Sequence, residues 1–278
     1  MWWFQRGLCV LPVTLVVWSS ATFVSSYVTA VLLGHVDPLV PYISDTSAAV
    51  PERCVFGLML NISSCLGVAN VYVRYKQVQA LAHEGDLRLH RLNYVGLVLG
   101  IMSSVGMCVA ANFQKTTITS VHLLGAGLTF GCGVLYILVQ TGMSYQMQPR
   151  FHGRDVLCAR TAVVLWTMAS VIIAFVSSVV LYDYIPSMNR KLHWSPTDMG
   201  YTAHLISAMA EWSLAFSFIC FFLTYIRDFQ ISVFLAHQKI QLRVEVVMQR
   251  NHLYDYTHYD VRVHVHHEEN SPLLAGGI

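Results

Sequence analysis

The sequence is poor in charge: of its 278 residues only 12% are Asp, Glu, Lys or Arg, whereas 55% are hydrophobic. A soluble domain carries about a quarter charged residues, so this chain lacks the polar side chains needed to cover a globule in water. Its formal net charge is only +2, and the basic residues sit in short clusters beside apolar stretches. This pattern gives no support for a nucleic-acid partner and indicates a membrane protein.

Sequence motifs of metal sites, disulfide frameworks and common enzymes are also lacking. The seven cysteines form no C-x-x-C pair, and most lie in apolar stretches, where a thiol behaves as a small hydrophobe. There is no Gly-rich phosphate loop, no G-x-S-x-G motif and no H-x(3–4)-D acyltransferase signature. We therefore assign no catalytic residue, no metal and no cofactor. Intramembrane chemistry need not use these motifs, so an enzyme stays open without positive support.

Long apolar segments are abundant. A membrane-spanning helix needs about 20 mostly apolar residues, because backbone groups facing lipid must be hydrogen-bonded within the segment. Six segments meet this requirement, at residues 8–33, 55–73, 92–111, 118–141, 159–181 and 201–226. The sequence thus predicts an all-α, polytopic membrane protein with a six-helix bundle over residues 1–230. Residues 231–278 are predicted to form a tail that is first amphipathic and then disordered.

The basic residues predict the orientation of the bundle. If the N-terminus is cytosolic, most of the 17 Lys and Arg residues lie in cytosolic segments, Arg74 and Arg160 among them. Only Arg53, Lys115, Arg190 and Lys191 then lie on the opposite side. By the positive-inside rule, both termini are predicted to be cytosolic.

Glu211 is the most unusual residue within the spans. By the helical rise of 1.5 Å per residue, it lies roughly 15 Å below the non-cytosolic surface. An ionised carboxylate there is costly, so it should be protonated, paired or facing a wet cavity. His204 and Ser207 share its helix face, and His122 enters its own span at a similar depth to His204. We predict a polar cluster of these four residues, with two interpretations open: interhelical hydrogen bonds that fix the packing, or proton sensing and ligand binding.

Two further motifs concern packing and sorting. Gly96-x-x-x-Gly100 allows helix backbones to approach closely, either within one bundle or at a dimer face. In the tail, Glu269 followed by Leu273 and Leu274 fits the acidic dileucine pattern [DE]xxxL[LI], which clathrin adaptors read on the cytosolic side. We interpret it as an endosome–lysosome address, because such signals are read by receptors and are not membrane anchors.

Several short motifs recur at defined places in the predicted topology. Pro41-Tyr42-Ile43-Ser44-Asp45-Thr46 follows the first span, YVRYKQ at 72–77 closes the second, and ANFQ at 111–114 ends the third. The sixth span carries EWS at 211–213 and FLTYIRDFQ at 222–230. Together these resemble the damage-regulated autophagy modulator (DRAM) family of six-span proteins, over roughly residues 1–232. MWWFQ at 1–5 and SYQMQP at 144–149 resemble one vertebrate branch of that family most closely.

The resemblance implies a lysosomal or late-endosomal membrane protein that promotes autophagy and is linked to apoptosis, and it supplies no catalytic residue, so we expect a non-enzymatic role. It also implies kinship with a Golgi protein needed for lipid remodelling of glycosylphosphatidylinositol anchors. The alternative function is therefore lipid binding or lipid remodelling in a polar pocket lined by Glu211, His204 and the Asp45 loop. Membrane lipid and a clathrin adaptor are the expected partners. A cavity that reaches Glu211 would favour the lipid function, whereas a packed and paired Glu211 would favour a modulator that recruits proteins.

Overall fold

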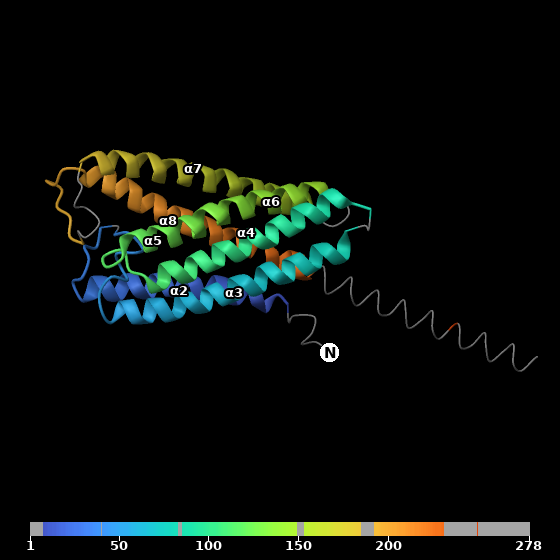
Figure 1. Ribbon diagram of the computed structural model, residues 1–278, viewed down its shortest axis with the longest axis horizontal. Coiled ribbons are helices and arrows are strands. Elements are labelled where there is room, and N and C mark those ends of the chain that lie inside the picture. The colour runs from blue at the N-terminus through green and yellow to red at the C-terminus, as the bar shows by residue number, and fades with distance from the viewer. Residues whose placement is uncertain are drawn as a thin grey trace, which may run out of the picture. The chain divides into compact units, whose positions relative to one another are not determined.

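The computed structural model describes residues 8–39, 41–82, 85–148, 153–184 and 192–230, together with residue 249. This part of the chain is a bundle of helices (Figure 1). In chain order they are α2 (Val10–Leu32), α3 (Glu52–Leu81), α4 (Leu87–Asn112), α5 (Thr119–Gly127), the π-helical turn η1 (Leu128–Cys132), α6 (Gly133–Gln146), α7 (Arg154–Tyr184) and α8 (Tyr201–Leu223). The predicted amphipathic segment and the dileucine motif lie outside the described residues.

Six helical segments are long and apolar enough to cross a membrane. They are Val10–Leu32, Glu52–Leu81, Leu87–Asn112, Thr119–Gln146, Arg154–Val179 and Tyr201–Gln230. In the fourth, α5, η1 and α6 follow one another without a break. The described residues contain helices and turns without a strand, and the predicted six-span, all-α fold is confirmed.

The helices extend further than the apolar segments at one end of the bundle. The second span was predicted to end at residue 73 and the fifth to begin at residue 159, but α3 continues to Leu81 and α7 begins at Arg154. Arg74, expected just beyond the second span, and Arg160, expected at the start of the fifth, lie inside these helices with 0% exposure. Their guanidinium groups are paired between the helices, as described below.

Helix contacts place α4 at the centre of one side of the bundle. It packs against α3 and against α5, η1 and α6, while α8 packs against α7 and contacts α2. A Cβ atom on Gly100 would lie 2.6 Å from the Val71 side chain, and one on Gly96 would lie 3.1 Å from the amide nitrogen of Gln140. These two glycines therefore serve packing within the bundle, as the first of our two interpretations held.

The π-helical turn lies in the middle of the fourth span. Such turns leave backbone groups without their usual helical partners and occur often at functional sites. Here the Ser103 hydroxyl donates to the Thr129 carbonyl at 2.7 Å, and the Thr129 hydroxyl donates to the Gly125 carbonyl at 2.8 Å. The Ser103 bond holds the turn against α4, and the Thr129 bond stabilises the turn within its own span.

One end of the bundle is closed by the segment between α2 and α3, which lies beside the start of α5 and the segment before α8 (Figure 1, left end). The segment folds back on itself, since the backbone N–H groups of Asp45 and Thr46 both donate to the Tyr42 carbonyl. The indole N–H of Trp212 in α8 donates to the Pro41 carbonyl at 2.8 Å. This bond ties the segment to the middle of α8, at the residue that follows Glu211.

Candidate functional site: an intramembrane cavity

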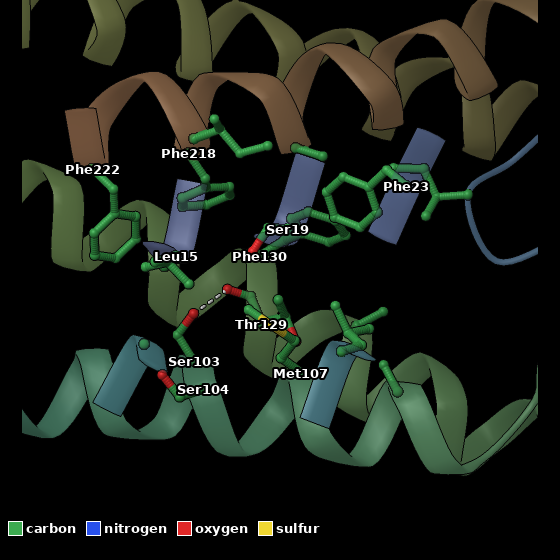
Figure 2. A pocket seen from close by; sticks show the side chains of 18 of the residues that line it. Leu15, Ser19, Phe23, Ser103, Ser104, Met107, Thr129, Phe130, Phe218 and Phe222 are labelled. Carbon is green, nitrogen blue, oxygen red and sulfur yellow. Dashed lines mark hydrogen bonds between the residues drawn. The ribbon is translucent and has the colours of Figure 1, made fainter. Parts of the chain in front are cut away.

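A cavity of about 150 Å³ lies within the bundle. It is bounded by α2, α3, α4, the α5–η1–α6 span and α8, and by Ile43 and Ser44 of the closing segment. Figure 2 shows Phe23, Phe130, Phe218 and Phe222 among the apolar side chains of its wall. Its interior is therefore suited to hydrocarbon.

The cavity is long in relation to its volume. Its lining residues on α8 run from Glu211 to Phe222, which at 1.5 Å per residue corresponds to roughly 16 Å along the helix axis. Glu211, His122 and Ser44 lie at the end beneath the closing segment, and Tyr136 and Phe222 lie toward the other end. The site thus has a polar end and an apolar body.

Most polar side chains on the cavity wall already have hydrogen-bond partners. The serine bonds run from Ser103 to the Thr129 carbonyl at 2.7 Å (Figure 2, dashed line), from Ser104 to the Gly100 carbonyl at 3.0 Å and from Ser19 to Ser63 at 3.0 Å. Nδ1 of His122 lies 2.7 Å from the Phe113 carbonyl and so carries the proton of that bond. These groups therefore do not need a hydrogen bond from a ligand.

Glu211 is the exception. Its carboxyl accepts a hydrogen bond from the backbone of Ile43, but its Oε2 atom is buried and has no hydrogen-bond partner among the described residues. Lys115 and Asp45 are the charges that act on it most strongly. They pair with each other, with Lys115 Nζ 3.2 Å from Asp45 Oδ1. Buried polar atoms normally have a hydrogen-bond partner, so Oε2 is the position at which a ligand could supply one.

The four residues that we expected in one cluster are placed at two different sites in the structure. His122 and Glu211 line the cavity, whereas His204 and Ser207 are not among its lining residues. The His204 ring stacks on Trp194 with centroids 4.2 Å apart and meets the edge of Tyr42 at 4.9 Å. Ser207 hydrogen-bonds to Ser178 at 3.1 Å. These two side chains fasten α8 to its neighbours.

The predicted signature residues Pro41, Tyr42, Ser44 and Asp45 all lie around the polar end of the cavity. Ser44 lines it, Tyr42 packs beneath the Lys115 ammonium at 4.1 Å, and Asp45 forms the ion pair with Lys115. Within the described ranges, no group of three or more His, Cys, Asp and Glu residues is arranged to hold a metal ion.

Burial shifts the pKa of two groups in the closing segment. It raises the pKa of Tyr42 to about 12. It also raises the pKa of Asp45, although the Lys115 ammonium acts in the opposite direction. The folded protein therefore holds the Asp45 proton more tightly than the unfolded chain does.

This shift predicts a pH-dependent stability. The free energy of unfolding should fall as the pH rises from about 4, the pKa of Asp in an unfolded chain, through the raised pKa of the folded protein. Asp45→Asn should flatten this slope. The measurement is the unfolding temperature in detergent across that range, with Asp155→Asn, an exposed acid in the first turn of α7, as control. An unchanged slope in Asp45→Asn would assign the dependence to another group.

A second polar cluster lies at the opposite end of the bundle, and the sequence analysis did not anticipate it. Asp228 pairs with two buried arginines: Arg74 Nη1 lies 2.9 Å from its Oδ2 atom, and Arg160 contacts the same oxygen. Arg74 also donates to Gln140 at 3.1 Å, and Arg160 donates to Thr224 at 3.0 Å. This Arg74–Asp228–Arg160 cluster joins α3, α6, α7 and the end of the sixth span.

Aromatic contacts connect this cluster to the cavity. Both guanidinium groups lie over the Tyr225 ring, with the Cζ atoms of Arg74 and Arg160 5.5 and 5.2 Å from its centroid. Its hydroxyl donates to the Tyr136 hydroxyl at 2.7 Å, and Tyr136 lines the cavity. The signal was present in the sequence, because YVRYKQ, SYQMQP and FLTYIRDFQ supply Arg74, Ser144 and Asp228, which meet here.

The fold and the cavity define a class: a six-span helical membrane protein with a mostly apolar site whose described residues include one buried carboxyl oxygen without a hydrogen-bond partner. The sequence matches the Frag1/DRAM/Sfk1/Cwh43P N-terminal domain over residues 7–232. The chain belongs to this Frag1/DRAM family, as the motifs predicted.

Individual relatives agree with this assignment. The chain is 52% identical to human DNA damage-regulated autophagy modulator protein 2 over 257 residues, which cover 92% of this chain and 93% of the relative. It is 42% identical to Xenopus laevis DNA damage-regulated autophagy modulator protein 1, covering 82% and 93% respectively. A shorter match, 37% over 141 residues, covers 50% of this chain and 59% of the Danio rerio modulator of macroautophagy TMEM150B. No solved structure matches.

Proposed function

We propose that this protein promotes autophagy from the lysosomal or late-endosomal membrane, with a link to apoptosis and without catalysing a reaction. The observation that carries this proposal is the 52% identity, over nearly the whole of both chains, to a protein named as an autophagy modulator. The family assignment over residues 7–232 supports it.

The proposal includes an orientation. Arg74 and Arg160 are buried and no longer count as loop charges, but the remaining basic residues still favour the same end of the bundle as cytosolic. The termini are then in the cytosol. The closing segment and the polar end of the cavity face the lumen, and the Arg74–Asp228–Arg160 cluster lies at the cytosolic end.

The sorting part of this proposal predicts a change of location. In cells that lack the endogenous protein, Leu273→Ala/Leu274→Ala should move the chain from lysosomes to the plasma membrane, because adaptors no longer retrieve it. The variant should also restore less autophagic flux than the wild type. The measurements are surface biotinylation and degradation of an autophagy cargo, with Ser271→Ala, which leaves the dileucine pattern intact, as control. Wild type that fails to raise flux in these cells would contradict the autophagy function itself.

A second candidate function is lipid binding, and the cavity favours it. The wall is apolar over most of its length, and among its described residues the buried oxygen without a partner, Oε2 of Glu211, lies at the polar end. An apolar site with a few polar groups at one end is typical of ligand pockets. The lipid-pocket hypothesis named Glu211, His204 and the Asp45 loop. In the structure Glu211 lines the pocket together with Ser44 of the Asp45 loop, and the histidine that lines it is His122 instead of His204.

Filling the cavity should abolish lipid binding. Ala215 is buried on the cavity wall, so in Ala215→Phe the ring should occupy the space that a lipid chain would use. We expect mass spectrometry of protein purified in mild detergent to detect a retained lipid with the wild type and to detect less than a tenth as much with this variant. Ala162→Phe, on an exposed position of α7, adds the same ring outside the cavity and should retain the lipid. Equal lipid content in all three proteins would contradict a specific site.

A further inference from the structure

We propose that the cavity binds a single-chain amphiphile with a protonated amine head group, whose ammonium pairs with Glu211 and whose chain extends toward Phe222. This inference rests on the proposed lipid-binding function and names the ligand class of that site. It is carried by three properties of the cavity: its shape, the hydrogen-bond state of its wall and the charge at its polar end.

The shape favours one hydrocarbon chain. Ligand pockets for drug-sized molecules measure about 300–1,000 Å³, whereas this cavity measures about 150 Å³. It nevertheless extends from Glu211 to Phe222, roughly 16 Å along α8. A long space of this small volume favours one extended chain over the two chains of a phospholipid.

The hydrogen bonds already formed by the polar side chains of the wall favour a ligand that supplies a donor. The hydroxyl groups of Ser19, Ser103 and Ser104 donate within the protein. Among the described residues of the wall, the buried polar atom without a partner is Oε2 of Glu211, an acceptor when the carboxyl is ionised. An ammonium group offers N–H donors and no acceptor, so one of its N–H groups can satisfy this oxygen.

The charges at the polar end select a cation. Lys115 and Asp45 neutralise each other across 3.2 Å, and His122 is held by the Phe113 carbonyl at 2.7 Å. Glu211 has no ion pair among the described residues, so it contributes the uncompensated charge when ionised. A carboxylate or phosphate head group would place a like charge beside it in a site of low polarity, whereas an ammonium forms a charge-assisted hydrogen bond.

The test uses three photoreactive probes that share one chain length and carry the diazirine at the chain end. Their head groups are a primary amine, an alcohol and a carboxylic acid. The full-length protein is placed in phosphatidylcholine nanodiscs at neutral pH, irradiated and digested, and labelled peptides are quantified. In the wild type we expect the amine to label the cavity wall near Tyr136 and Phe222 about tenfold more than the acid, as the strength of hydrogen bonds to charged groups implies.

Variants separate the head-group preference from lipid binding as such. In Glu211→Gln, labelling by the amine should fall to the level of the alcohol, while labelling by the alcohol persists. Glu211→Asp keeps the charge and should retain the preference, which guards against a loss caused by misfolding. In Ala215→Phe all three probes should lose cavity labelling, whereas Ala162→Phe should behave as wild type.

The possible outcomes test the amine class, the pairing with Glu211 and lipid binding separately. Equal labelling by the three probes, lost in Ala215→Phe, would overturn the amine class and leave lipid binding intact. An amine preference that survives in Glu211→Gln would overturn the pairing with Glu211. The absence of cavity labelling by every probe, in protein that unfolds at the wild-type temperature, would overturn both this inference and the lipid-binding function.

Discussion

Asp228→Asn is expected to destabilise the membrane domain by about 3–5 kcal/mol, the cost of removing one partner from a buried ion pair. Arg74 and Arg160 both have 0% exposure and share the Asp228 carboxylate. Without that charge, two guanidinium groups remain buried beside each other. We expect a large fall in both the unfolding temperature in detergent and the yield of monodisperse protein.

The ratio of two cations to one anion makes the prediction more specific. Arg74→Met should cost less than Asp228→Asn, because the remaining Arg160–Asp228 pair is balanced in charge. Asp155→Asn, at an exposed position at the start of α7, should leave the unfolding temperature unchanged. If Arg74→Met proved the more harmful of the two, packing of the arginine side chain would outweigh charge balance in this cluster.

The number and type of the spanning helices could be predicted from the sequence because the bilayer imposes a simple requirement. Each crossing needs about 20 apolar residues, and a helix is the structure that satisfies its own backbone. The helix ends were less predictable. Residues 74–81 are polar enough to look like a loop, but α3 continues through them because Arg74 and Gln77 bond to Asp228.

The Arg74–Asp228–Arg160 cluster was missed because its members look ordinary in the sequence. Arginines that follow an apolar stretch are typical of cytosolic connections, and Arg160 and Asp228 are 68 residues apart. The motifs that revealed the family contain Arg74 and Asp228, but a motif does not state which helix faces which. That information arises only when α3, α7 and the sixth span pack together.

The cavity was partly predictable for a similar reason. The helical spacing placed His204, Ser207 and Glu211 on one face of α8, but it gave no information on the path of the closing segment. Tyr42 and Trp194 cover His204, and Glu211 lies beyond them at the cavity. The dileucine motif at Glu269, Leu273 and Leu274 remains a prediction, since residues 250–278 lie outside the described part.

The close contact between α4 and the fourth span predicts opposite effects for two glycine substitutions. A Cβ atom on Gly106 would lie 2.6 Å from both the Leu128 Cβ atom and the Thr129 backbone nitrogen. Gly106→Ala must therefore separate α4 from η1, at an overpacking cost of about 1–3 kcal/mol. Gly142 in α6 has nothing within 4 Å of such an atom, so Gly142→Ala should stabilise by about 1 kcal/mol through helix propensity.

Comparison of the two variants isolates the effect of the contact, because both make the same chemical change in a spanning helix. The unfolding temperature should fall for Gly106→Ala and rise for Gly142→Ala. Since Thr129 lines the cavity and hydrogen-bonds to Ser103 on α4, separation of α4 from η1 should also widen the site. We expect retained lipid to become more heterogeneous in chain length in Gly106→Ala, by mass spectrometry. A stabilised Gly106→Ala protein with unchanged lipid would mean that this contact relaxes at no cost and does not set the width of the cavity.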